Sequence, residues 1–160
     1  MIQAVRQLRK KIKNSPSNQS LLLAQAAVPG GEDAAESILR GKKIAALGLA
    51  YKPDVDDLRE SPATEVVHLL QKEGAQVKVW EPFKPDAKIK DVDMAISLEA
   101  ALKETDAIVL LVRHTEFVSL KPEEVAAKTK ARLVIDCVNA WDADHWNKAG
   151  FKLFRLGVRK

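Results

Sequence analysis

The residues best suited to chemistry lie together in one segment, Gly48 to Pro62, between an apolar run and the start of a helical pattern. A loop of this length inside a compact domain is usually functional. Free amides at a helix start and nearby cations both favour an anion, and an arginine can hold a phosphate through two hydrogen bonds. A solvated charged loop with internal ion pairs would have the same composition, so both interpretations stay open at this point. The charged residues of the segment are Lys52, Arg59, Asp54, Asp56, Asp57 and Glu60.

Two better-defined kinds of site are not indicated by this loop. Only one glycine, Gly48, follows the first apolar run, whereas the dinucleotide fingerprint needs three glycines at set spacing. We therefore expect that this turn does not hold the pyrophosphate of NAD. The carboxylates Asp54, Asp56 and Asp57 lack the spacing of a calcium loop, so capping and pairing with the cations of the loop are favoured over metal binding.

Two further residues invite a catalytic interpretation, because each follows an expected strand. Cys137 has no general base assigned to it, and we expect it to fill a tight strand end rather than act as a nucleophile. His114 could orient a substrate, but a hydrogen-bonded structural role is favoured.

From residue 41 onward, apolar runs alternate with helical patterns. The strands and helices that they predict must position these side chains. Strands are predicted over residues 43–47, 76–80, 107–112, 133–136 and 152–156. Helices are predicted over residues 62–73, 98–104, 122–130 and 143–149, the first capped by Ser61. This order predicts an α/β fold, a Rossmann-like three-layer sandwich with a mainly parallel sheet. Right-handed crossovers place the C-terminal ends of all strands on one edge, where such folds bind ligands.

Residues 1–40 differ from residues 41–160, and we expect them to form a helical extension or linker without chemistry of its own. Val5, Leu8 and Ile12 recur at helical spacing and predict a short amphipathic helix, and residues 32–39 are a candidate for another.

Composition excludes several functional classes. Five of the 26 lysines and arginines lie in the first thirteen residues, which leaves 21 against 22 acidic residues elsewhere, so no specific nucleic-acid partner is expected. No apolar stretch approaches the roughly 20 residues that cross a membrane, and no apolar region follows the basic start as in a secretory signal. The single cysteine excludes an internal disulfide and favours a cytoplasmic setting.

The sixteen residues from Gly48 to Ala63 closely resemble the signature of the C-terminal domain of the UDP-glucose/GDP-mannose dehydrogenase family, nearest its UDP-N-acetylmannosamine dehydrogenase branch. The resemblance covers about residues 41–157. Further segments that match the family follow in the expected order: residues 74–82, residues 105–109, His114, residues 134–136, Asn139 and Trp141.

The resemblance implies a specific role for this region. Full-length members oxidise the C6 hydroxyl of a nucleotide-sugar to a carboxylate in two NAD-dependent steps. In them an N-terminal Rossmann domain binds NAD, a central region carries a nucleophilic cysteine, and the C-terminal domain closes over the UDP end of the substrate. By resemblance, Tyr51 and Lys52 contact the UDP-sugar and Arg59 reaches the NAD. No catalytic residue and no metal ligand is expected in this chain.

The chain departs from the family pattern in two respects. The catalytic cysteine motif and the NAD fingerprint are missing, and Val138 stands where the family has a substrate-binding arginine. We therefore expect a fragment or split subunit of a UDP-sugar dehydrogenase that is inactive alone, with a separate NAD-binding subunit or a second copy as candidate partners. The alternatives are a non-catalytic nucleotide-binding relic or regulatory module, and an adaptor that binds polyanions through the basic N-terminus.

Overall fold

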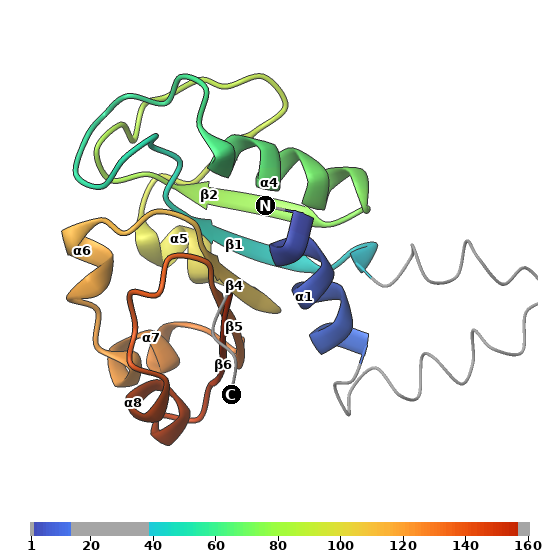
Figure 1. Ribbon diagram of the computed structural model, residues 1–160, viewed down its shortest axis with the longest axis vertical. Helices are drawn as coiled ribbons and strands as arrows, with labels where there is room; N and C mark the ends of the chain where they lie inside the picture. The colour runs from blue at the N-terminus through green and yellow to red at the C-terminus, as the bar shows by residue number, and fades with distance from the viewer. Residues whose placement is uncertain (1, 14–38, 157–160) are drawn as a thin grey trace, which may run out of the picture.

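A six-stranded sheet forms the centre of the protein, as the computed structural model shows for residues 2–13 and 39–156 (Figure 1). The strand order is β3-β2-β1-β4-β5-β6, and every neighbouring pair is parallel. The predicted α/β fold with a mainly parallel sheet is confirmed. The strands are β1 (Lys43–Leu47), β2 (Gln76–Trp80), β3 (Asp93–Met94), β4 (Ala107–Leu110), β5 (Leu133–Asp136) and β6 (Lys152–Arg155). The short edge strand β3 was not among the five predicted strands.

Helices cover both faces of this sheet. One face packs against α1 (Ile2–Lys13) and α4 (Pro62–Lys72), and α1 lies beside α4 (Figure 1). The other face packs against apolar side chains of the remaining helices. These are α5 (Leu98–Leu102), α6 (Thr115–Val118), α7 (Pro122–Lys128) and α8 (Ala143–Lys148). Ser61 caps α4 as predicted, with its hydroxyl accepting from the Ala63 amide at 3.2 Å.

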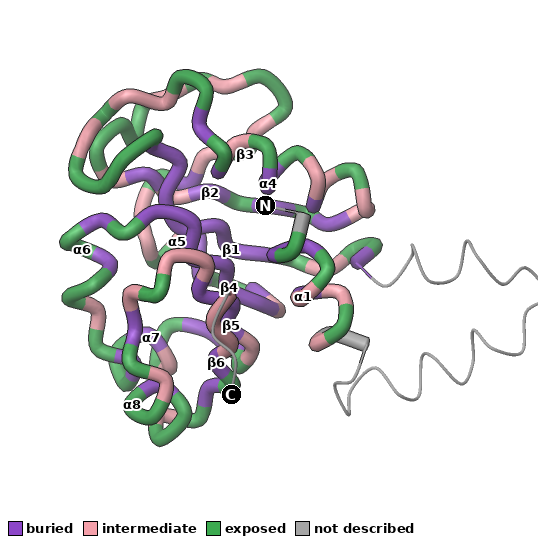
Figure 2. Tube along the Cα trace, in the orientation of Figure 1, coloured by how far each residue is buried: buried purple, intermediate pink, exposed green. Residues whose placement is uncertain are grey.

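The central strands are buried on both sides, as a parallel sheet between two helical layers requires (Figure 2). Alternate residues of β1 and β4 enter the two apolar clusters: Ile44 and Val109 face α1 and α4, whereas Leu47 and Ile108 face α5 and α7. The site loops therefore extend from a sheet that is fixed from both faces.

The predicted amphipathic helix at the N-terminus is confirmed as α1. Leu8 is fully buried in the cluster that contains α4. Arg9 pairs with Glu73 at 2.7 Å, and the Lys11 ammonium lies 3.7 Å from the centre of the Phe154 ring. The helix predicted over residues 32–39 lies, except for residue 39, outside the described residues. Within the described ranges, no helix has the length and apolar character needed to cross a membrane.

Candidate functional site

The C-terminal edge of the sheet carries a long loop, residues 48–61, which begins in close contact with the end of β4. Gly48 has a φ of +94°, and its amide donates to the Trp80 carbonyl at 2.9 Å. A Cβ at this position would lie 2.6 Å from the Cβ of Val112. Only glycine allows this approach, so the start of the loop is fixed by backbone packing.

The tip of the loop folds back on itself. The Tyr51 amide donates to the Asp57 carbonyl at 2.8 Å, and Asp54 between them adopts a left-handed conformation with a φ of 58°. Tyr51 and Lys52, predicted to contact the UDP-sugar, are both exposed, and the Lys52 ammonium lies 5.8 Å from the centre of the Tyr51 ring. The structure therefore places this pair together on the outer side of a closed loop.

Arg59, predicted to reach the cofactor, is paired within the loop. Its Nε and Nη2 donate to the two carboxylate oxygens of Asp57, both at 3.0 Å, while 88% of its side chain is exposed. These hydrogen bonds lower the pKa of Asp57 to about 2. The predicted ion pairing of the loop is confirmed for Asp57 and Arg59, and it leaves Nη1 and the second Nη2 hydrogen of the exposed guanidinium available to an anion.

The start of α4 is less open to an anion than its sequence suggests. The amides of Ala63 and Thr64 donate to the hydroxyl and the carbonyl of Ser61, at 3.2 and 3.1 Å. The expectation of free amides at this helix start is wrong for these two residues, because Ser61 satisfies both donors.

Glu81, which directly follows β2, is the residue of this edge that sequence reasoning missed. Its fully buried carboxylate accepts from the amides of Leu49, Ala50 and Phe83, at 2.7, 2.9 and 3.0 Å. Burial alone raises the pKa of Glu81, but hydrogen bonds from His114 and from the Leu49 and Phe83 amides outweigh burial and lower it. The available signal was a carboxylate immediately after a buried strand, but apart from the nearby Phe83 amide its partners Leu49, Ala50 and His114 lie more than 30 residues away in the sequence.

His114 connects Glu81 to the tip of the loop, and the hydrogen bonding predicted for it is confirmed. Its Nε2 lies 3.0 Å from Glu81 Oε2, and its Nδ1 accepts from the Asp54 amide at 2.8 Å. The ring is fully buried between Phe83 and Phe117, whose centroids lie 4.8 and 5.5 Å away. Because Nδ1 accepts, the proton of the neutral ring resides on Nε2.

The carboxylate of Asp54 continues this network as the predicted capping group. It accepts from the amide and the hydroxyl of Thr115, at 2.8 and 2.6 Å, and so caps the short helix α6. These two hydrogen bonds lower the pKa of Asp54. In the described part of the chain, no group of three or more His, Cys, Asp or Glu side chains is arranged to hold a metal ion.

The turn after β5 is organised around a buried carboxylate, Asp136, which accepts from the amides of Val138 and Trp141 at 3.0 and 2.9 Å. Val138 packs against the apolar cluster beneath the turn. Burial, with a smaller effect from Asp136, raises the pKa of Cys137 to about 12, so its thiol is protonated and suited to a structural role.

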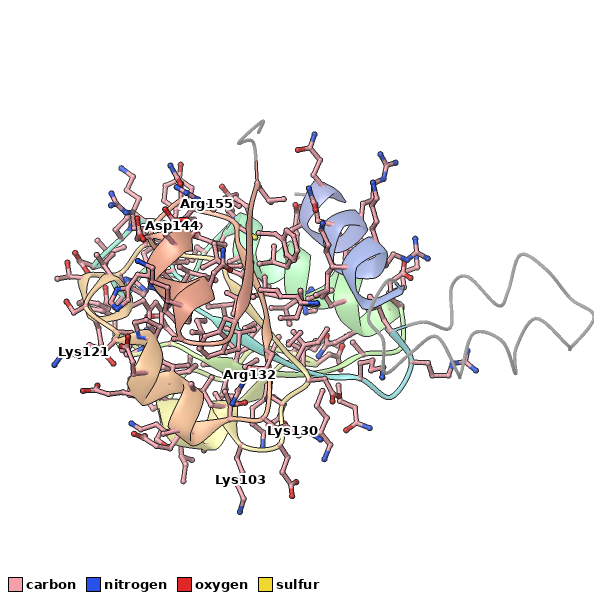
Figure 3. All side chains as sticks on the ribbon, turned by 90° about the horizontal axis from the view of Figure 1, so that it is seen from below. Lys103, Lys121, Lys130, Arg132, Asp144 and Arg155 are labelled. Atoms are coloured by element: carbon pink, nitrogen blue, oxygen red, sulfur yellow. The ribbon has the colours of Figure 1, made fainter. Side chains whose placement is uncertain are left out.

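Two further cations, Arg155 and Lys84, lie near the site. Arg155 at the end of β6 donates to Asn139 Oδ1 at 2.8 Å, beside Val138. Figure 3 shows Arg155 on the opposite side of the molecule from Lys103 and Lys130, which precede strands. An open groove of about 560 Å³ beside the loop is lined in part by Arg59 and Lys84.

Comparison with known proteins relates this arrangement to one family. Residues 45–143 match the UDP-glucose/GDP-mannose dehydrogenase family, UDP binding domain. A UDP-N-acetyl-D-mannosamine dehydrogenase of Methanocaldococcus jannaschii is 36% identical over 121 residues, which cover 74% of this chain and 27% of that protein. A UDP-glucose 6-dehydrogenase of Rhizobium meliloti is 36% identical over 127 residues, which cover 78% and 29%.

A solved structure extends the similarity to the whole fold. The NDP-N-acetyl-D-galactosaminuronic acid dehydrogenase of Methanosarcina mazei superposes with a TM-score of 0.68 at 27% identity, over 93% of this chain and 29% of that one. This chain therefore spans less than a third of the length of these relatives. Since the family match covers more than half of the chain, the protein belongs to the UDP-glucose/GDP-mannose dehydrogenase family and carries that family's UDP-binding domain.

Proposed function

We propose that this chain binds the UDP part of a nucleotide-sugar at the C-terminal edge of its sheet, as one component of an NAD-dependent UDP-sugar 6-dehydrogenase. The exposed pair Tyr51 and Lys52 carries the proposal, because a lysine ammonium and a phenol suit a phosphate and a sugar hydroxyl. Both residues lie on a loop whose start and tip are held by hydrogen bonds to the buried side chains of Glu81 and His114.

We infer that this chain does not provide the main binding site for NAD. Residues 48–61 separate β1 from α4, so no tight glycine-rich turn leads from strand to helix, and Ser61 holds the Ala63 and Thr64 amides at the start of α4. We propose that the NAD-binding part and the reactive cysteine belong to another portion of a longer protein or to a separate subunit. Arg59 is the residue of this chain that we expect to face that part.

Isothermal titration calorimetry of the full chain with UDP tests the proposal. We expect a dissociation constant on the order of 0.1–1 mM for the native chain, which corresponds to about −4 to −5.5 kcal/mol. Lys52→Gln should weaken binding by about threefold or more, because the ammonium is a direct phosphate contact. Lys103→Gln is the matched control: it removes the same charge at the opposite edge of the sheet and should leave the affinity unchanged.

Val138 supplies a second test that separates an active component from a relic. A hydrogen bond to a charged group contributes about 1.5–3 kcal/mol, so Val138→Arg should strengthen UDP binding by roughly tenfold or more. If neither the native chain nor Val138→Arg binds UDP at millimolar concentration, the domain is a non-catalytic relic.

A further inference from the structure

We infer that Glu81 and His114 are positioning residues. They set the conformation of the loop of residues 48–61, and thereby place Tyr51 and Lys52 where they can contact the nucleotide. The inference rests on the function proposed above. Neither residue contacts the ligand in this scheme, because both side chains are fully buried. They act on the loop through hydrogen bonds to its backbone.

The Glu81–His114 pair joins three segments that are distant in the sequence. Glu81 holds the start of the loop through the Leu49 and Ala50 amides, and holds its own turn through the Phe83 amide. The Glu81 carboxylate contacts His114 at 2.9–3.0 Å. The turns after β1, β2 and β4 therefore meet at one buried carboxylate.

The tip of the loop depends on His114 more directly. The Asp54 amide donates to Nδ1, and the same residue has a left-handed backbone that an aspartate adopts only at some cost. A strained conformation persists when its surroundings fix it, and here the surroundings are the His114 ring and the capped Thr115. Asp54 is two residues from Lys52, so a shift at Asp54 moves the ammonium.

The chemical state of the imidazole follows from its neighbours. Glu81 faces Nε2, while the Asp54 amide and, at 3.8 Å, its carboxylate face Nδ1. The rings of Phe83 and Phe117 pack against the imidazole in tilted contacts. A neutral ring with its proton on Nε2 satisfies both the acceptor of Glu81 and the donor of Asp54, and the opposite tautomer satisfies neither.

Nuclear magnetic resonance of the native chain tests this arrangement without any substitution. Long-range ¹H–¹⁵N correlation should identify His114 as the Nε2–H tautomer, and the Asp54, Leu49 and Ala50 amides should be protected from hydrogen exchange. The finding of His114 as the Nδ1–H tautomer, or of rapid exchange at these amides, would overturn the inference.

A pair of matched variants tests the effect on binding. His114→Phe removes both hydrogen bonds and keeps an aromatic ring between Phe83 and Phe117. His145→Phe is the control, because His145 has a comparable Nε2 contact of 2.9 Å to Glu123 but is exposed and lies on α8. We expect His114→Phe to weaken UDP binding by at least fivefold, and His145→Phe to leave it within twofold.

Binding must be compared at a temperature where circular dichroism shows both variants folded. A purely structural role predicts a lower melting temperature for His114→Phe with native affinity, and that result would refute the positioning role. If His114→Phe does not fold, the tautomer and exchange measurements on the native chain can still overturn the inference. Failure of the native chain to bind UDP would refute the proposed function, whereas the native-chain spectra test the network independently of it.

Discussion

Replacement of Gly48 by alanine should be among the most damaging single-methyl changes in this chain. A side chain at a positive φ costs about 1–2 kcal/mol, and Gly48 has a φ of +94°. The new Cβ would also lie 2.6 Å from the Val112 Cβ and 3.0 Å from the Val112 amide nitrogen. Such overpacking adds about 1–3 kcal/mol, so we expect a total loss of about 2–5 kcal/mol in the free energy of unfolding.

Gly41 provides the matched control, because its φ is also positive at +74° but a Cβ there would meet no atom within 4 Å. Gly41→Ala should therefore cost only the conformational part, about 1–2 kcal/mol. Urea unfolding followed by tryptophan fluorescence measures both variants. With a slope of about 2 kcal/mol per molar urea, the midpoint of Gly48→Ala should lie about 1 M below that of Gly41→Ala.

A double variant identifies the physical cause. Val112→Gly removes the Cβ that Gly48→Ala would contact, so the cost of Gly48→Ala should be smaller in the Val112→Gly background. Equal losses for Gly41→Ala and Gly48→Ala, or strict additivity of Gly48→Ala with Val112→Gly, would refute the argument that contact with the end of β4 makes glycine obligatory.

Three further predictions concern α1, Cys137 and Asp57. Leu8→Ala should lower the free energy of unfolding by about 2–5 kcal/mol in the same urea assay, because Leu8 is fully buried between α1 and the sheet; a loss below about 0.5 kcal/mol would mean that α1 does not pack there in solution. Cys137 should react with iodoacetamide at pH 8 far more slowly in the native chain than in urea, because a pKa raised from 9.0 to about 12 reduces the thiolate about a thousandfold; equal rates would contradict its burial. The Asp57 carboxyl should titrate by NMR near pH 2 and return toward 3.8 in Arg59→Gln; since its folded pKa is lowered, its stabilising effect is present above pH 3.8 and is lost as the pH falls toward 2.

Local patterns were sufficient to predict the main elements of the sheet. The strands 43–47, 76–80 and 133–136 were predicted at their observed bounds. The first and third are short, mainly apolar runs, whereas residues 76–80 alternate polar and apolar side chains and are followed closely by Pro82. The helix after Ser61 was also predicted correctly, since a serine cap and a proline in the first turn are signals contained within a few residues.

The elements that were missed depend on distant partners. Helix α6 has four residues and no side-chain cap from its own N-cap residue, and it is capped by Asp54, 61 residues earlier. Strand β3 has two residues and exists by pairing with Lys78 and Val79 of β2. Neither interaction leaves a periodic pattern in the sequence, because the stabilising group lies elsewhere in the chain.

The loop residues of the candidate site were predictable from the sequence, but the particular hydrogen bonds and ion pair that they form were not. The sequence indicated Tyr51, Lys52 and Arg59 as one charged loop, whereas the bidentate contact between Arg59 and Asp57 depends on how the loop folds back. The role of Glu81 was not predictable, because its amide partners meet only when β1 and β2 are adjacent in the sheet.

The order of strands has a consequence for synthesis of the protein. β1 lies between β2 and β4, and its register pairs Lys43 with Gln76 on one side and Ile44 with Ala107 on the other. The β1–β2 unit therefore emerges from the ribosome before the residues of β4 do. At roughly 5–20 residues per second, the intervening stretch takes on the order of a few seconds to translate. During that interval the nascent chain holds the apolar strand β1 with one edge unpaired, which is the kind of surface that recruits holding chaperones or aggregates with its copies.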